Sequence, residues 1–447
     1  MADDSFPARS AIASSQREQL RRLLAVLVPA NSFYTRKFSR AGVTATVTCL
    51  DKFSEKFPFT TKQELAEDQR AQPPYGTNLT FPLERYTRFH QTSGTVGAPL
   101  RWLDTPESWN WMVENWIEIL RAAGATSGDR VFFAFSFGPF IGFWLAFEAA
   151  QRIGCLCLPG GGLSSAARLR VMMENDATVL CCTPTYALRL AEVAAEEKID
   201  LRATRIRTIV VAGEPGGSIP ALRARLQERW HGARVFDHHG MTETGPVTHE
   251  CPKQPGVLHV LEPAYFAEVI DPSTGKPVAS GQRGELVLTT LGRVGSPLLR
   301  YRTGDLVKPI PQPSTLRSKA TAEDESTIDH PPCECGRHTL ALEGGILGRT
   351  DDMVIVRGVN VFPSAVEDII RACGDVAEYQ VTVSTARSLT ELSVQIEPTP
   401  GCPDPSALVK RLEKSFEAAL ALRVPVKTAP AGTLPRFEMK AKRWVKL

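Results

Sequence analysis

Residues 130–159 have the sequence RVFFAFSFGPFIGFWLAFEAAQRIGCLCLP, and this stretch decides which kind of fold to expect. The part after Arg130 is nearly apolar and long enough to cross a membrane. However, Asp129 and Arg130 precede it, the turn-forming residues 136–139 (SFGP) interrupt it, and Glu148 lies inside it. These features favour a buried strand, a turn and a core helix over a membrane span.

The same alternation of short apolar runs and longer helical patterns continues to residue 239. Strands are predicted at residues 131–135, 155–158, 178–182, 208–211 and 235–237. Helices are predicted between them, at residues 164–174, 186–197 and 219–230. This order predicts an α/β fold with a parallel sheet covered on both faces, and ligands at the carboxyl ends of its strands.

The flanking regions have a different character. Upstream, residues 107–123 carry an aromatic stripe at helical spacing, which indicates a core helix. Downstream, residues 267–270 and 284–288 predict strands of a smaller sheet, and residues 312–331 form a polar loop. From residue 353 a strand, a helix at 363–372, two more strands and an amphipathic helix at 405–422 predict a small α+β unit.

Length and composition agree with two domains. The 447 residues are too many for one ordinary core, so we expect a large domain at 1–350 and a small mobile α+β domain at 351–447. The large domain would combine parallel βα-layered sheets with a small β-subdomain. With 52 basic and 49 acidic residues, the chain has no broad charged field for nucleic acid or a membrane surface. Residues 1–20 lack the pattern of a secretory signal, so we expect a cytoplasmic protein with ten reduced cysteines.

Residues 91–99 (QTSGTVGAP) pack hydroxyls and glycines into one short loop. In such a loop backbone N–H groups can approach and cradle phosphate oxygens. The loop lacks the lysine of a Walker motif, and the chain has no well-placed Gly-x-Gly-x-x-Gly. P-loop hydrolysis and a Rossmann dehydrogenase are therefore poorly supported.

Further motifs follow this loop in a fixed order. They are GEP at 213–215, DHHGMTE at 237–243, YRTGD at 301–305, GRTDD at 348–352 and PRFEMK at 435–440. The ordered set resembles the adenylate-forming superfamily of acyl-CoA ligases and adenylation domains. Within it, FPFTTK at 57–62 and DDMVIVRGVNVFP at 351–363 are most similar to the phenylacetate-CoA ligase family. The resemblance covers nearly the whole chain.

The resemblance implies a reaction and its cofactors. An aryl or arylacetic acid would be activated with ATP and Mg²⁺ to an acyl-adenylate, with release of pyrophosphate. The acyl group would then pass to coenzyme A, with release of AMP. Two alternatives stay open: an aryl- or amino-acid-adenylating enzyme that loads a carrier protein, and a catalytically inactive nucleotide-binding homologue. Relatives of similar architecture often form homodimers, and neither the acid nor the oligomeric state follows from the sequence.

The resemblance also implies roles for individual residues. Glu243 would bind Mg²⁺, Thr242 the α-phosphate, and Asp305 both ribose hydroxyls with help from Arg349. The β- and γ-phosphates would be held by Thr92, Ser93, Gly94, Thr95 and Gly97. The adenine side of the site would be formed by Gly213, Glu214, Pro215, Asp237, His238, His239, Gly240 and Met241.

Two residues would link the nucleotide site to domain movement. Lys440 matches the catalytic lysine, whose ammonium neutralises charge as the substrate carboxylate attacks the α-phosphorus. Asp351 matches the hinge about which the small domain rotates after adenylation to admit the thiol. Three positions depart from the family pattern: Val96 replaces a Thr, His239 replaces a Tyr, and Met439 replaces a Gly.

Two other sets of residues are candidate binding groups. Phe135, Phe137, Phe140 and Ala212, with His238 and His239, are candidate walls of an acyl pocket that favours a flat aromatic acid. Cys251, His259, Cys333 and Cys335 supply the four ligands of a structural Zn²⁺ site, because Cys-x-Cys in one loop joins a distant Cys and His. The alternative is four residues that bind no metal.

Overall fold

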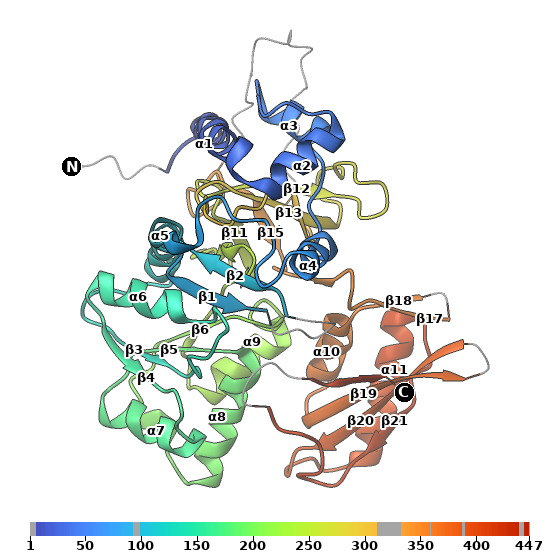
Figure 1. Cartoon of the computed structure of the whole chain (residues 1–447). Helices are drawn as coiled ribbons and strands as arrows, with labels where there is room; N and C mark the ends of the chain where they lie inside the picture. The colour runs from blue at the N-terminus through green and yellow to red at the C-terminus, as the bar shows by residue number, and fades with distance from the viewer. Residues whose placement is uncertain are drawn as a thin grey trace.

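A parallel sheet of five strands lies at the centre of the larger part of the molecule (Figure 1). The computed structural model describes residues 6–92, 99–310, 332–357, 359–386, 389–437 and 442–446. The sheet's strands, in spatial order, are β4 (Leu156–Pro159), β3 (Arg130–Phe133), β5 (Val179–Cys182), β6 (Thr208–Val211) and β7 (Arg234–Asp237). All neighbouring pairs are parallel, as predicted.

Helices cover both faces of this sheet because its strands are apolar on both sides. Along β3, Phe132 joins one core cluster, and its neighbours Val131 and Phe133 join the other. The connecting helices are α6 (Trp144–Ile153), α7 (Ser165–Glu174), α8 (Pro184–Glu196) and α9 (Pro220–Arg229), and α5 (Pro106–Ala122) packs beside α6. The predicted strand, turn and helix within residues 130–159 are confirmed. Among the described helices, none has the length and apolarity that crossing a bilayer requires.

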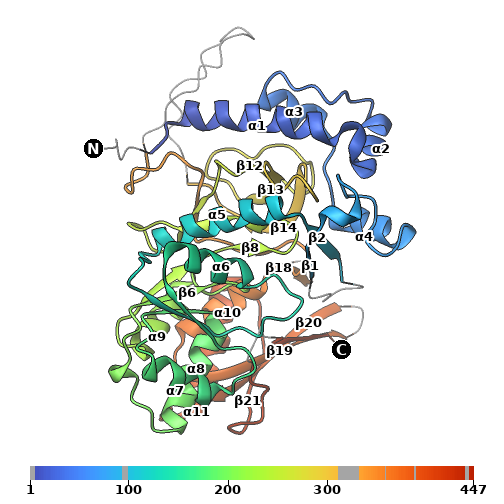
Figure 2. The ribbon, with the colours of Figure 1, turned by 60° about the vertical axis from the view of Figure 1, so that its left-hand side comes forward.

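Residues 9–56 form helices at the end of the molecule away from the parallel sheet, and α4 and a hairpin lead from them toward the sheet (Figures 1 and 2). These elements are α1 (Arg9–Ala30), α2 (Ser32–Ala41), α3 (Leu50–Lys56) and α4 (Lys62–Ala71), followed by the 3-10 turn Leu83–Arg85 and the hairpin of β1 (Arg88–Gln91) and β2 (Arg101–Asp104). Buried Gln16 of α1 donates hydrogen bonds to the carbonyls of Glu262 and Tyr265. These contacts tie the helices to the β-subdomain.

The β-subdomain consists of antiparallel strands beyond the parallel sheet. One sheet contains β12 (Tyr265–Ile270), β13 (Gly284–Thr290), β14 (Tyr301–Val307) and β16 (Gly348–Arg349). A second contains β10 (Thr248–Glu250), β11 (Val257–Val260) and β15 (Ala341–Glu343), and β8 (Gly240–Met241) pairs with β9 (Gly245–Pro246). The predicted polar loop at 312–331 lies outside the described residues.

The C-terminal part has its own sheet and core. Its elements are β17 (Val354–Val356), β18 (Val359–Val361), α10 (Pro363–Ala372), β19 (Val376–Ala386), β20 (Leu389–Pro398), α11 (Pro405–Leu420), β21 (Val426–Thr428) and β22 (Trp444–Lys446). Strands β21, β20, β19 and β22 form one sheet, and its buried side chains make a separate cluster with α10 and α11. Helix α10 lies beside α9 (Figure 1). The predicted fold class is confirmed.

One detail near the ligand-binding end of the sheet differs from the prediction. Strand β3 ends at Phe133, two residues earlier than expected. Phe137 has a φ of 53°, in the left-handed region that an aromatic residue rarely adopts, so the chain is no longer extended at this residue. Phe135 and Phe137 lie beyond the end of the strand and pack edge to face, with ring centroids 5.3 Å apart and an angle of 66° between the rings.

Candidate functional site

The segment after β6 passes closely over the end of β7. Gly213 has a φ of 95°, and a Cβ atom on Gly217 would lie 2.4 Å from the carboxyl carbon of Asp237. The Asp237 carboxylate accepts hydrogen bonds from the Ser218 hydroxyl (2.5 Å) and the His238 backbone N–H (3.0 Å). Burial raises the pKa of Asp237. This carboxylate therefore holds the strand ends together.

A buried carboxylate, Asp305, lies at the centre of a charged cluster. Asp305 on β14 is paired in register with Arg349 on β16, and Arg349 Nη1 donates to its Oδ1 atom at 3.0 Å. His239 Nε2 lies 3.1 Å from Asp305 Oδ2. Arg349 also donates through Nε to Asp351 Oδ1 at 2.8 Å. Burial acts to lower the pKa of Arg349, but the charges of Asp305 and Asp351 raise it. Arg349 thus connects the predicted ribose carboxylate with the predicted hinge.

Thr242 and Glu243 lie in the turn between β8 and β9, and their backbone is anchored by Arg293. The Arg293 Nη1 atom donates to the carbonyls of Thr242 (2.7 Å) and Glu243 (2.9 Å). Its other nitrogens form a fork on Asp104, with Nε to Oδ1 at 2.7 Å and Nη2 to Oδ2 at 2.6 Å. Both charged side chains are fully buried. A paired charge of this kind fixes the turn rigidly.

The Glu243 carboxylate faces a lysine from helix α4, far earlier in the sequence. Lys62 Nζ lies 3.3 Å from Glu243 Oε1, and the Tyr301 hydroxyl lies 3.4 Å from the same oxygen. Lys62 is the first residue of α4, whose N-terminus is fixed by a capping box between Thr61 and Glu64. A cation therefore stands beside the predicted Mg²⁺ ligand, in a site whose Ser/Thr/Gly loop has no lysine of its own.

The predicted acyl-pocket residues come from three segments: the turn before α6, the end of β6 and the end of β7. Phe135, Phe137 and Ala212 pack against the core cluster of α5 and α6, and Phe140 is half-buried in the turn before α6. The His238 ring lies 4.3 Å from the Trp116 ring, and its Nδ1 atom is 2.6 Å from the Thr248 carbonyl. Burial lowers the pKa of His238 to about 3, so this side chain is neutral.

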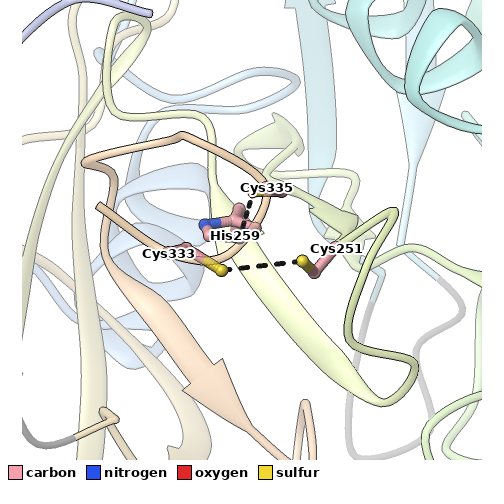
Figure 3. A group of neighbouring side chains, drawn as sticks. All are labelled: Cys251, His259, Cys333 and Cys335. Atoms are coloured by element: carbon pink, nitrogen blue, oxygen red, sulfur yellow. Dashed lines mark hydrogen bonds between the residues drawn. The ribbon is translucent and has the colours of Figure 1, made fainter. Parts of the chain in front are cut away.

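The four predicted zinc ligands converge on one point (Figure 3). Their ligand atoms all lie within 4.8 Å of one another. The Cys251 and Cys333 sulfurs are 3.7 Å apart, and Cys335 Sγ is 3.4 Å from His259 Nε2. Tetrahedral zinc with Zn–S bonds of about 2.3 Å separates its sulfur ligands by roughly 3.8 Å. The His259 Nδ1 atom is engaged by Thr339 at 3.0 Å, which orients Nε2 toward the thiols.

The comparison with known proteins agrees with this arrangement. A family model described as "AMP-binding enzyme" matches residues 42–292, and one described as "AMP-binding enzyme C-terminal domain" matches residues 358–446. The phenylacetate-coenzyme A ligase of Thermus thermophilus is 32% identical over 392 residues, covering 87% of this chain and 82% of that protein. The one of Pseudomonas putida is 30% identical over 440 residues, covering 96% and 93%. This chain belongs to the phenylacetate-CoA ligase family. The resemblance drawn from the motifs is confirmed.

Solved structures extend the comparison to the arrangement of the domains. A 2-hydroxyisobutyryl-CoA ligase in a postadenylation state with 2-HIB-AMP has a TM-score of 0.89 at 26% identity, covering 100% of this chain and 93% of that one. The same ligase in its thioesterification state, with 2-HIB-AMP and CoA, has a TM-score of 0.71 at 26% identity, covering 99% and 91%. The higher TM-score shows that the described parts of this phenylacetate-CoA ligase family member are arranged more like the postadenylation state than like the thioesterification state.

Several family motif residues lie outside the described residues. These are Ser93, Gly94, Thr95, Val96 and Gly97 of the phosphate loop, and Met439 and Lys440 near the C-terminus. At the base of the phosphate loop, the Thr92 N–H donates to the Leu100 carbonyl at 2.9 Å. The Leu100 N–H donates back to Thr92 Oγ1 at 3.0 Å. The Glu214 side chain accepts the Thr185 N–H at 2.8 Å, so it faces the start of α8.

Reasoning from the sequence missed the residues that support the site. The motif at 57–62 contains Lys62 but does not indicate its contact with Glu243, and no motif contains Arg293 or Asp104. The sequence shows each of these two charges among apolar neighbours: Asp104 in WLD at 102–104 and Arg293 in LGRV at 291–294. Such charges are usually exposed, and only the fold shows that these two meet.

Proposed function

We propose that this protein is an ATP-dependent carboxylate–coenzyme A ligase. It would join a carboxylic acid to AMP, release pyrophosphate, and transfer the acyl group to the thiol of coenzyme A with release of AMP. The observation that supports this best is the pairing of Asp305 with Arg349 on the strand whose first residue, Tyr301, contacts Glu243, in a chain similar over most of its length to phenylacetate-CoA ligases.

The described residues suit the parts of ATP assigned to them. The two oxygens of Asp305 can accept both ribose hydroxyls, with Arg349 and His239 holding the carboxylate in place. Glu243 is a carboxylate with a nearly buried side chain, which fits a Mg²⁺ ion that also binds phosphate oxygens. When bound, Mg²⁺ would neutralise phosphate charge. Lys62, 3.3 Å from Glu243, would add a second positive charge facing the departing pyrophosphate.

The second half-reaction requires a change of arrangement. We place the domain boundary between residues 350 and 351, with Asp351 as the hinge and Lys440 on the small domain. In the first arrangement Lys440 would neutralise charge at the α-phosphorus. Rotation of the small domain would then withdraw it and admit the thiol, so that one acyl site serves two reactions.

The acid that fits the acyl pocket best is aryl or arylacetic. The predicted pocket residues are Phe135, Phe137, Phe140 and Ala212, together with neutral His238, whose ring packs on Trp116. Aromatic rings stack on flat substrates, and the pocket residues carry no charge to attract a second charged group.

The experiment that tests this function measures pyrophosphate release from ATP and Mg²⁺ across aryl, arylacetic, short hydroxy and amino acids, with and without coenzyme A. We expect release with an aryl or arylacetic acid, at least tenfold above the other classes, and stimulation by coenzyme A. Release that coenzyme A leaves unchanged would indicate a carrier-protein thiol as acceptor. The absence of release with every acid would contradict the proposal.

We also propose a structural Zn²⁺ ion held by Cys251, His259, Cys333 and Cys335. The distances between the ligand atoms fit tetrahedral coordination, and the four residues leave no open position for substrate. Such an ion would fasten the loop containing Cys333 and Cys335 to strand β11.

Replacing one ligand should remove the metal. We expect about one zinc per chain in the purified protein, and loss of that zinc in Cys335→Ser together with a melting temperature lower by several degrees. The matched control is Cys402→Ser, at a half-buried cysteine outside the cluster, which should keep the metal. Mass spectrometry measures the zinc content of each protein, and thermal unfolding measures its melting temperature. The proposal would be disproved if the parent protein, freed of zinc, kept the melting temperature of the zinc-loaded protein.

A further inference from the structure

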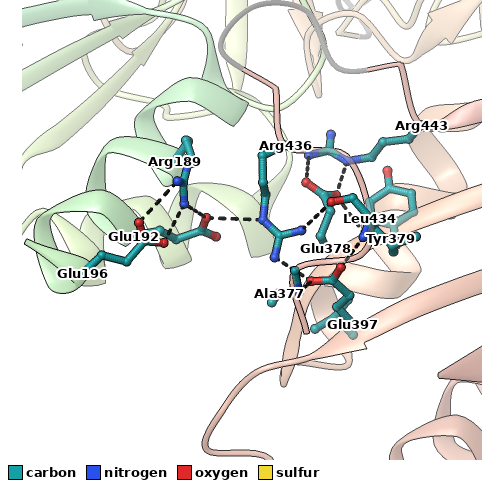
Figure 4. A network of polar contacts seen from close by, with 12 residues as sticks. Arg189, Glu192, Glu196, Ala377, Glu378, Tyr379, Glu397, Leu434, Arg436 and Arg443 are labelled. Atoms are coloured by element: carbon teal, nitrogen blue, oxygen red, sulfur yellow. Dashed lines mark hydrogen bonds and ion pairs between the residues drawn. The ribbon is translucent and has the colours of Figure 1, made fainter. Parts of the chain in front are cut away.

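Two arginines lie on either side of Lys440 in the sequence, and both are held by the small domain's sheet. Arg436 precedes Lys440 by four residues and Arg443 follows it by three. Arg436 Nη2 lies 2.6 Å from Glu397 Oε2 on β20. Arg443 forms a fork on Glu378 of β19, with Nε to Oε1 at 2.6 Å and Nη2 to Oε2 at 3.2 Å (Figure 4).

The two glutamates explain why two arginines gather here. Glu378 and Glu397 are direct partners in the antiparallel register of β19 and β20, and both are buried. Two carboxylates opposite each other repel, and burial strengthens the repulsion. One arginine beside each carboxylate offsets this repulsion. The positions of Arg436 and Arg443 are therefore set by the sheet, and they fix the two ends of the segment that carries Lys440.

The same arginines also contact one face of helix α8, which belongs to the large domain. Arg443 Nη1 donates to Thr185 Oγ1 at 3.3 Å. Arg436 Nε lies 3.9 Å from Glu192 Oε2 (Figure 4). Thr185 and Glu192 are seven residues apart, which is about two helical turns, so they lie on the same side of α8. We call these four residues, Thr185, Glu192, Arg436 and Arg443, the α8 latch.

The residues of the α8 latch make two kinds of contact: some lie within the small domain, and others join it to the large domain. The Arg436–Glu397 and Arg443–Glu378 pairs lie within the small domain and persist when it rotates. The contacts to Thr185 and Glu192 cross between domains, in an arrangement that matches a postadenylation state better than a thioesterification state. The Arg436 and Glu192 side chains are 28% and 32% exposed, so their attraction is weak. A weak contact can be broken in every turnover.

We propose that Thr185 and Glu192 are positioning residues for adenylation. They hold the small domain, and with it the Lys440 segment, in the arrangement that forms the acyl-adenylate, and they take no part in thioester formation. This inference rests on the proposed ligase function. It predicts that weakening the α8 latch slows one half-reaction only, whereas a loss of stability slows both.

The test uses the full-length double variant Thr185→Val with Glu192→Gln. Adenylation is measured as pyrophosphate release without coenzyme A, and thioester formation is measured from preformed acyl-adenylate and coenzyme A. We expect adenylation to fall roughly five- to tenfold, as for the loss of weak polar contacts. Thioester formation should be unchanged or faster. Equal losses in both half-reactions, or no loss in either, would overturn the inference.

A matched control and an activity-free readout complete the design. Glu196→Gln alters the next glutamate on α8, which pairs with Arg189 of the same helix at 2.8 Å, and it should leave both half-reactions unchanged. Hydrogen exchange of α8 and of residues 376–379 should be faster in the double variant than in the parent. Because this readout needs no substrate, it separates failure of the α8 latch from failure of the proposed function. Unchanged exchange would reject the α8 latch even in a protein that adenylates no acid.

Discussion

Lys440→Ala leaves the protein folded and abolishes formation of the acyl-adenylate. We expect the rate of pyrophosphate release to fall by a factor of at least about 100–1,000, as when an enzyme loses a charge that stabilises its transition state. The reason is that negative charge builds up on the α-phosphate as the substrate carboxylate attacks. Thioester formation from preformed acyl-adenylate should persist, because we propose that Lys440 is withdrawn in that half-reaction.

The control for Lys440 lies two residues further along. Lys442 is exposed, and Lys442→Ala removes the same charge from the same basic segment. Its adenylation rate should stay within about twofold of the parent, as expected for a solvated surface charge. Equal melting temperatures for both variants would show that the effect is catalytic. Normal adenylation by Lys440→Ala would refute the proposed mechanism.

Arg293→Met lowers the free energy of unfolding by about 3–5 kcal/mol, the cost of leaving one member of a buried ion pair without its partner. Arg293 and Asp104 are fully buried and joined by two hydrogen bonds, so no water can replace the lost guanidinium. The carbonyls of Thr242 and Glu243 lose their donor at the same time. Urea unfolding followed by tryptophan fluorescence measures the change.

Two further variants show whether burial is the cause. Arg170→Met breaks an ion pair with Glu197 whose side chains are 58% and 43% exposed, and it should cost less than about 1 kcal/mol. The double variant Arg293→Met with Asp104→Leu removes both buried charges and should be more stable than Arg293→Met alone. If Arg293→Met and Arg170→Met were equally stable, the Arg293–Asp104 pair would not support the turn in the way argued above.

Local sequence patterns predicted the strands and helices that depend on the polarity and turn signals of their own residues. The strand predicted at 178–182 is observed as β5 at Val179–Cys182, whose four residues are all apolar, and Pro363 is the first residue of α10, which spans its predicted range. In α1, Leu20, Leu23, Leu24 and Leu27 have helical spacing and are buried, so a usable signal in the first hundred residues was overlooked.

The candidate site was predictable only where a motif carries it. Asp305, Arg349 and His239 come from three motifs and meet within hydrogen-bond distance. Arg293 and Asp104 are separated by 189 residues, and no local pattern reports such a contact. The α8 latch depends on how two domains sit against each other, which periodicity does not encode.

The order of strands in the small sheet has a consequence for protein synthesis. Among the described residues, strand β22 pairs with β19 through Trp444–Lys446, and Arg443, just before it, neutralises Glu378. A ribosome that has not passed these codons leaves the edge of β19 open and a buried carboxylate without its cation. The parallel sheet of the large domain needs none of these residues. A chain that ends before Arg443 therefore keeps every strand of the parallel sheet, but its small sheet lacks one edge strand and one buried cation.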